Sequence, residues 1–332
     1  MPDPPPPALL VPARDITLHD AQERRRDYAR RAKAEGTWTV YEGHWERFRS
    51  FSAEIGRDPG PPTDPALLAD YVIALRERGQ AASTLSVACA AIAHRNRAAG
   101  AESPLSHPQV REVLAGAKRL AARAQAGRGA SDPLLPADIR SFISNLKPGL
   151  GGQRDMALLT FGVAGGFRRE ELCRLKLENV RFDPEGIVVT LPWSKGDQEG
   201  EGHTRRICYG DALELCPVTN LKTWLAASGI SRGFLFRPVL HGRALERPLS
   251  PRRIDQIVRE YGRRVLRDKP DTVAKKFSAH SLRSGLCTAA ALAGKPEHEI
   301  RDHVGHKSAS TTAKYIRAAK IRKSTVTRGI GL

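Results

Sequence analysis

The spacing of hydrophobic residues predicts a helix soon after the start of the chain. Large apolar side chains recur at the spacing of one helix face between residues 38 and 55. They are Trp38, Tyr41, Trp45, Phe48 and Ile55. We interpret this stripe as one side of a hydrophobic core. A second helix follows, because Asp64 and Pro65 suit an N-cap and a first helical position, and Gly79 suits the turn after the last residue.

Two more helices complete a small helical domain. One is predicted from residue 83 to about residue 99, and the next begins near residue 108. The domain therefore covers residues 15–124 and is rich in arginine. Before it, residues 1–14 contain six prolines and no periodic apolar pattern, which predicts a disordered tail. After it, residues 125–133 are small, polar and glycine-containing, as is typical of a linker.

The remainder of the chain has a mixed pattern. Two β-rich runs, GIVVTLPW and HTRRICYG, flank a glycine-rich and acidic connection and predict a β-hairpin. Helical spacing lies on both sides of it, near 136–146, 152–164, 169–176, 217–227, 251–267, 279–293 and 296–304, and around Tyr315. We therefore predict a mainly α fold with a small antiparallel β-sheet (α+β). The second domain would span residues 134–316, followed by a C-terminal tail at 317–332.

The charge of the chain points to a polyanionic partner. Among its 332 residues, 54 Lys and Arg stand against 36 Asp and Glu, which gives a net charge of +18. Such an excess favours nucleic acid, because neutralising phosphates releases condensed counterions. An anionic membrane is the competing partner, but no apolar run approaches the about 20 residues of a spanning helix. The N-terminus lacks a secretory signal, so we expect a cytoplasmic, nucleoid-associated protein.

The pattern of potential metal ligands gives little support for a metal site. The five cysteines are widely spaced and form no Cys-x-x-Cys pair, which predicts reduced thiols. Cys173 and Cys287 lie in apolar helical surroundings and suit buried small hydrophobic residues. His303 and His306 have a spacing that two ligands of one metal could use, but no third ligand follows at a suitable spacing.

A set of polar residues in the second domain points to chemistry on phosphate. Arg168 lies in the run GFRREE, and His280 and Arg283 lie in the run HSLR. His306 follows a glycine, and Tyr315 comes nine residues after His306. Lys195 stands where the first β-run turns.

This set resembles the tyrosine recombinases, the phage-integrase family, over about residues 134–320. The catalytic domain of that family carries Gly-x-Arg-x-x-Glu, a hairpin Lys, His-x-x-Arg, and Gly-His followed about nine residues later by a nucleophilic Tyr. The resemblance implies six catalytic residues, namely Arg168, Lys195, His280, Arg283, His306 and Tyr315. Glu171 would orient Arg168 or buttress the site, without acting on the phosphate itself. The helical domain at 15–124 corresponds in kind to the family's core-binding domain.

Physical chemistry explains why such residues occur together. Two guanidiniums can hold the non-bridging oxygens of a phosphodiester while negative charge builds on them, and the resemblance implies that Arg168 and Arg283 do so. His306 would donate one more hydrogen bond. A phenol has an unperturbed pKa near 10, so Tyr315 needs a proton acceptor, for which the resemblance implies His280. Lys195 would protonate the departing 5′-oxygen.

Several of these residues also suit simpler interpretations. Tyr315 is compatible with an aromatic side chain that anchors a helix to the core, and only its separation of nine residues from His306 in the sequence favours the nucleophile. Arg205 and Arg206 in the second β-run suit phosphate contacts, or equally a solvated hairpin edge. His303 stands at a position that is usually apolar in the family, so we expect it to be partly exposed.

The resemblance implies a metal- and ATP-independent enzyme that cleaves and rejoins double-stranded DNA through a 3′-phosphotyrosine intermediate. Strand exchange would pass through a Holliday junction in a homo-tetramer on paired recombination sites, with accessory DNA-bending proteins as further partners. The C-terminal tail would dock on a neighbouring protomer. Two alternatives remain at this point, a type IB topoisomerase and a catalytically silent, architectural DNA-binding protein.

Overall fold

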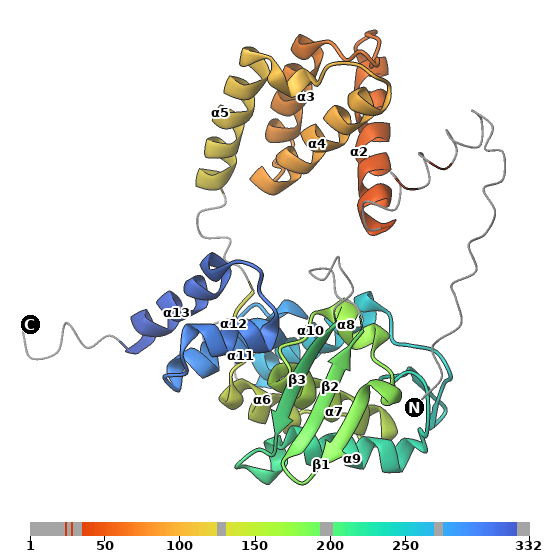
Figure 1. Ribbon diagram of the computed structural model, residues 1–332, viewed down its shortest axis with the longest axis vertical. Helices are drawn as coiled ribbons and strands as arrows, with labels where there is room; N and C mark the ends of the chain where they lie inside the picture. Colours follow the sequence, from red (N-terminus) through yellow and green to blue (C-terminus); the bar gives the residue numbers. More distant parts are fainter. Residues whose placement is uncertain are drawn as a thin grey trace, which may run out of the picture. The chain divides into compact units, whose positions relative to one another are not determined.

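The computed structural model describes residues 35–124, 131–192, 202–268 and 275–323, together with Arg24 and Tyr28 (Figure 1). The predicted tail at 1–14, Lys195, and the end of the predicted C-terminal tail lie outside the described residues. The chain divides into two compact units, Met1–Arg128 and Gly129–Leu332.

All the regular elements among the described residues of the first unit are helical. It contains α2 (Glu35–Glu54), α3 (Pro65–Glu77), α4 (Ala82–Ala98) and α5 (Pro108–Ala124), with a 3₁₀ turn at Pro104–Ser106 (Figure 1). Asp64 caps α3 as expected, because its carboxylate accepts a hydrogen bond from the backbone N–H of Ala66 at 2.9 Å.

The predicted aromatic stripe lies only partly in the core of the first unit. Trp45 and Phe48 are buried there, whereas Trp38 and Tyr41 are half-buried and pack against the ring of His94. The expectation was wrong for Ile55, which is 45% exposed. Helix α2 has ended at Glu54 before this residue, so the helical spacing does not carry Ile55 into the core.

The second unit combines helices with a three-stranded sheet, which confirms the predicted mainly helical fold with a small antiparallel sheet. Its helices are α6 (Pro136–Ile143), α7 (Leu150–Ala164), α8 (Arg169–Arg174), α9 (Pro217–Ser228), α10 (Pro251–Asp268), α11 (His280–Leu292), α12 (Glu297–Val304) and α13 (Ala309–Lys323). Its main strands are β1 (Val180–Asp183), β2 (Gly186–Leu191) and β3 (His203–Cys208), and β4 (Val239–Leu240) pairs with β5 (Arg243–Ala244).

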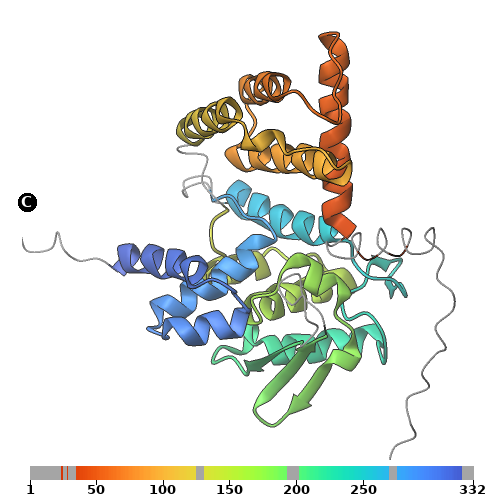
Figure 2. The same cartoon turned by 45° about the horizontal axis from the view of Figure 1, so that its top comes forward.

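The sheet has the order β1-β2-β3, with both pairs antiparallel. The predicted hairpin is formed by β2 and β3, and β1 is an added edge strand that the sequence pattern did not reveal. In both views α11, α12 and α13 lie together, and β1 lies at the edge of the sheet away from them (Figures 1 and 2). Helix α7 runs through the core of the unit, where the largest buried hydrophobic side chains are aromatic, including Phe161, Phe167, Trp224 and Phe236.

No helix among the described residues has the length and apolar character that a membrane crossing requires.

A buried polar network joins α7 to α10. Two nitrogens of Arg154 donate to one carboxylate oxygen of Asp155, at 2.9 and 2.6 Å. The hydroxyl of Tyr261 donates to the other oxygen at 2.8 Å, and all three residues are buried. Burial, and then the Asp155 charge, raise the pKa of Tyr261, so its hydroxyl keeps the proton that it donates.

The substitution Tyr261→Phe should lower the free energy of unfolding by about 1–3 kcal/mol, because it leaves a buried carboxylate oxygen of Asp155 without its donor. Urea denaturation measures the loss. The matched control is Tyr209→Phe, since the Tyr209 hydroxyl meets Lys222 at the surface, and a change within about 0.5 kcal/mol is expected there. Equal losses of unfolding free energy in the two variants would contradict a stabilising role of the buried network.

Candidate active site

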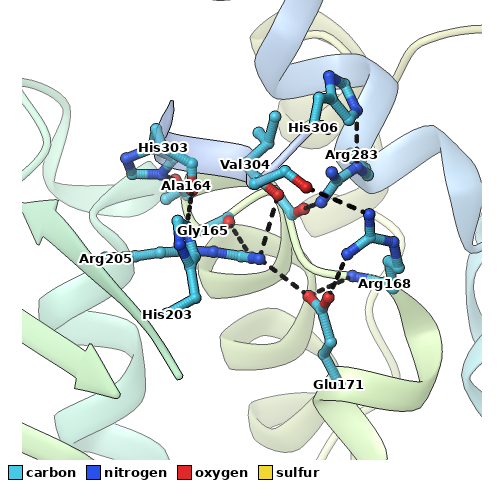
Figure 3. A network of polar contacts seen from close by, with 12 residues as sticks. Ala164, Gly165, Arg168, Glu171, His203, Arg205, Arg283, His303, Val304 and His306 are labelled. Carbon is cyan, nitrogen blue, oxygen red and sulfur yellow. Dashed lines mark hydrogen bonds and ion pairs between the residues drawn. The ribbon is translucent and has the colours of Figure 1, made fainter. Parts of the chain in front are cut away.

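Arg168 is held by Glu171 at the start of α8. The backbone N–H of Arg168 donates to Glu171 Oε2 at 3.0 Å, and its Nη1 donates to Glu171 Oε1 at 2.6 Å (Figure 3). Burial by itself raises the pKa of Glu171, but the charges of Arg205 and Arg168 and their hydrogen bonds bring this pKa below its ordinary value. The carboxylate is therefore charged and orients Arg168, the role expected from the sequence.

Arg283 lies in the first turns of α11 and is only 2% exposed. Its Nη1 donates to the carbonyl of Gly166 at 2.8 Å, and its Nε donates to His306 Nε2 at 3.2 Å. Its Nη2 is buried and has no hydrogen-bond partner among the described residues. Burial, and then the charges of Arg168 and Arg205, lower the pKa of Arg283 to about 10, so it stays charged at neutral pH.

His306 is fixed by contacts on both ring nitrogens. Since a guanidinium N–H can only donate, Nε2 of His306 accepts from Arg283, and Nδ1 carries the proton and donates to the hydroxyl of Thr312 at 2.9 Å. Burial, and then the Arg283 charge, lower the pKa of His306 to about 4. In this arrangement Nε2 is therefore an acceptor, and the donor role toward phosphate that the sequence resemblance implied stays a prediction.

Tyr315 lies on α13 with its hydroxyl 3.0 Å from Nε2 of His280. Its ring is parallel to that of His306, with 6.1 Å between centroids, and packs on a small cluster that contains Cys287. Burial raises the pKa of Tyr315, so the phenol is protonated. Partial burial, and then the charges of Arg283 and Arg168, lower the pKa of His280, whose neutral ring can accept that proton.

Four segments of one unit thus bring together five of the six predicted catalytic residues, Arg168, His280, Arg283, His306 and Tyr315. Lys195, the sixth, belongs to the β2–β3 connection outside the described residues, and its role stays a prediction.

Comparisons with known proteins agree with this arrangement. Residues 133–322 match the model of the phage integrase family. An integrase/recombinase XerD homolog of Selenomonas ruminantium is 31% identical over 299 residues, which cover 88% of this chain and 84% of that protein. The chain belongs to the phage integrase family. The tyrosine recombinase XerA of Pyrococcus furiosus is 31% identical over 177 residues, but these cover 53% of this chain and 54% of XerA.

Two solved structures show the same fold as this phage integrase family member. The Tn1549 transposon integrase in complex with transposon right end DNA superposes with a TM-score of 0.59 and 16% identity, over 91% of this chain and 96% of that one. A lambda integrase dimer bound to a COC′ core site gives a TM-score of 0.57 and 16% identity, over 90% and 95% of the two chains.

Two glycines of this integrase make the close packing of the site feasible. Gly166 has a φ of +57°, and a Cβ atom there would lie 2.8 Å from side-chain atoms of Leu286 and Val304. Gly305 ends α12 with a φ of +65°. Both positions favour glycine because other residues rarely adopt a positive φ. The glycines that precede Arg168 and His306 in the sequence motifs thus have a backbone role.

The prediction that Arg205 contacts DNA was wrong, as was its alternative of a solvated hairpin edge. The side chain is 1% exposed and donates to Glu171 Oε2 at 3.1 Å and to the carbonyl of Gly165 at 2.8 Å (Figure 3). The alternation of β3 held a signal for this, because Arg205 shares its face with buried Ile207. Arg206 faces the other side, is 46% exposed and pairs with Asp183, so its contact with DNA stays a prediction.

Two histidines near the site have structural partners. Nε2 of His303 donates to the carbonyl of Ala164 at 3.0 Å, and His303 is half-buried, as expected. His203, which the sequence did not single out, donates from Nε2 to the carbonyl of His303 at 3.1 Å (Figure 3). Within the described ranges, no group of three or more His, Cys, Asp or Glu residues is arranged to hold a metal ion.

The buried hydroxyl of Thr312 should determine the tautomer of His306. The change Thr312→Val removes the acceptor for Nδ1–H, so the proton can move to Nε2 and oppose the N–H of Arg283. We expect the rate of DNA cleavage to fall about tenfold, the equivalent of about 1.4 kcal/mol for one hydrogen bond. Ring ¹⁵N chemical shifts of His306 report the tautomer. Thr312→Ser keeps the hydroxyl and serves as the control; an unchanged tautomer in Thr312→Val would refute the assignment.

Proposed function

We propose that this chain is a site-specific DNA recombinase that cleaves and rejoins DNA strands through Tyr315. The observation that carries the proposal is the 3.0 Å contact between the Tyr315 hydroxyl and His280 Nε2, beside two arginines with donors to spare. Its membership of the phage integrase family supports the proposal, as do relatives that are named recombinases.

The charges around the site suit one phosphodiester. Arg168, Arg205 and Arg283 surround the single carboxylate of Glu171, so this cluster of four side chains carries two positive charges in excess. A phosphodiester has one negative charge and oxygens that accept hydrogen bonds from guanidinium forks. The buried Nη2 of Arg283, which has no described partner, is a suitable donor for a non-bridging oxygen.

In the proposed cleavage step, His280 Nε2 takes the proton of the Tyr315 hydroxyl while the phenolic oxygen bonds to phosphorus, and the bond from phosphorus to the 5′-oxygen breaks. Lys195 gives the proton that the departing 5′-oxygen needs. The 3′-phosphotyrosine keeps the energy of the broken bond, so the reverse step rejoins a strand without ATP, and no step uses a metal.

We propose that residues 15–124 form a core-binding domain on duplex DNA, and that four protomers exchange strands between paired sites through a Holliday junction, with accessory DNA-bending proteins and a nucleoid location. One structural relative is a lambda integrase dimer bound to a core site. Ile321 near the end of α13 is 71% exposed, which suits a C-terminal segment that docks on a neighbouring protomer.

A nicked suicide duplex tests the cleavage chemistry, because loss of a short fragment traps the covalent intermediate. The wild-type chain should form a protein–DNA adduct that resists denaturation, and Tyr315→Phe should form none, since it lacks the nucleophilic oxygen. Gel electrophoresis of labelled duplex measures the adduct. Trapping by Tyr315→Phe would refute the nucleophile. Relaxation of supercoiled DNA with no recombinant between two sites would instead indicate a topoisomerase.

The pH dependence of cleavage should report His280. Because its pKa lies below the ordinary 6.5, the neutral, proton-accepting form persists as pH falls through 6.5. The rate of adduct formation should therefore decline only below that pH. His280→Asn should lower the rate about 10²–10⁴-fold and abolish this acidic limb. Single-turnover rates at subsaturating duplex, which report the pKa of the free protein, measure both effects between pH 4.5 and 9. A midpoint above 6.5 under these conditions would contradict the role of a neutral His280.

A further inference from the structure

The guanidinium of Arg205 connects three separate segments of the second unit. It donates to the carbonyl of Gly165 after α7 at 2.8 Å, to Glu171 in α8 at 3.1 Å, and to the carbonyl of Val304 at the end of α12 at 3.3 Å. It also lies over the ring of Phe167, 4.9 Å from the centroid. An arginine is rarely buried without such compensation, because removal of its charge from water is costly.

Each of these three acceptors either holds a catalytic side chain itself or adjoins a residue whose carbonyl does so. Gly165 precedes Gly166, whose carbonyl accepts from Arg283. Glu171 holds the guanidinium of Arg168. Val304 precedes Gly305, whose carbonyl lies 3.4 Å from Nη2 of Arg168.

We propose that Arg205 is a positioning residue for DNA cleavage, and that it acts on Arg168 and Arg283 through Glu171 and the two helix ends. The inference rests on the proposed function, since it assigns these arginines to the phosphate. Both Nη atoms of Arg205 are occupied by Glu171 and two backbone carbonyls, whereas Nη2 of Arg283 has no hydrogen-bond partner among the described residues and is the donor proposed for phosphate.

Two physical effects support this role. Without Arg205, Glu171 Oε2 would keep only the backbone N–H of Arg168 as a donor, and the carboxylate would lose the positive charge that contributes most to lowering its pKa. The carbonyls of Gly165 and Val304, at the negative ends of α7 and α12, would also lose a buried cationic partner. Displacements of about 1 Å in a catalytic frame can cost about 10²-fold in rate.

The first experiment compares Arg205→Met and Arg205→Lys with the control Arg181→Met, which removes an arginine that is 70% exposed on β1 of the same sheet. Three quantities are measured: the single-turnover rate of adduct formation on saturating nicked duplex, the Kd for intact duplex by fluorescence anisotropy, and the urea midpoint. Arg205→Met should cleave about 100-fold more slowly with a Kd within about threefold of wild type. The cleavage rate of Arg205→Lys should lie between those of wild type and Arg205→Met.

Other outcomes would overturn the role. A weaker Kd with an unchanged cleavage rate at saturation would indicate that Arg205 contacts DNA. Wild-type cleavage by Arg205→Met would show that positioning does not need it. Absence of any adduct with the wild-type chain would instead contradict the proposed function.

A double-mutant cycle with Glu171→Gln provides a test even if Arg205→Met does not fold. Glutamine keeps the shape and an acceptor for Arg168 but removes the charge that Arg205 meets. If Arg205 acts through Glu171, then Arg205→Lys should slow cleavage much less in the Glu171→Gln background than in wild type. Multiplicative effects on the rate would show that the two residues act independently, and would contradict the proposed path.

Discussion

The site depends on one carboxylate that two arginines share. Glu171 accepts from Arg168 and Arg205, and Arg283 lies close enough to both for their charges to lower its pKa. Three guanidiniums with restricted access to water repel one another, so Glu171 and a set of backbone carbonyls are needed to hold them. The compensation is incomplete, since one negative charge faces three positive ones. This residual charge makes a buried arginine cluster suitable for phosphate and also makes it costly to maintain.

The carbonyls that hold the arginines belong to the backbone at the ends of two helices. The turn at Ala164–Gly166 accepts from His303, Arg205 and Arg283, and the turn at 303–305 accepts from His203, Arg205 and Arg168. Helix ends expose carbonyls that lack helical partners, and their partial negative charge favours cations. The glycine in each turn allows a positive φ and the close approach of neighbouring chain. The catalytic geometry is therefore built largely into the backbone of α7 and α12.

Because periodicity and motif spacing are local, the sequence was sufficient to predict most helices, the hairpin and five of the polar residues that meet at the candidate site. It did not reveal Arg205 as a core residue. The strand pattern places Arg205 on the same face as Ile207. Arginines are rarely buried, however, and this favoured an exposed side chain. Only tertiary structure brings Glu171 and Val304 to its guanidinium. Thr312 was missed for a related reason, because its role depends on the contact between its hydroxyl and Nδ1 of His306, which only the folded chain brings about.

The positive charge of the arginines also affects the strength of His280 as a base. Positive charges at Arg283 and Arg168 help to lower the pKa of His280 and so weaken it as a base in the free protein. Burial keeps Tyr315 protonated at the same time. A phosphodiester between the guanidiniums offsets part of their charge, which raises the proton affinity of His280 next to the Tyr315 hydroxyl. In the proposed mechanism the base would thus become stronger when the phosphate is in place, and the tyrosine would be least reactive when DNA is absent.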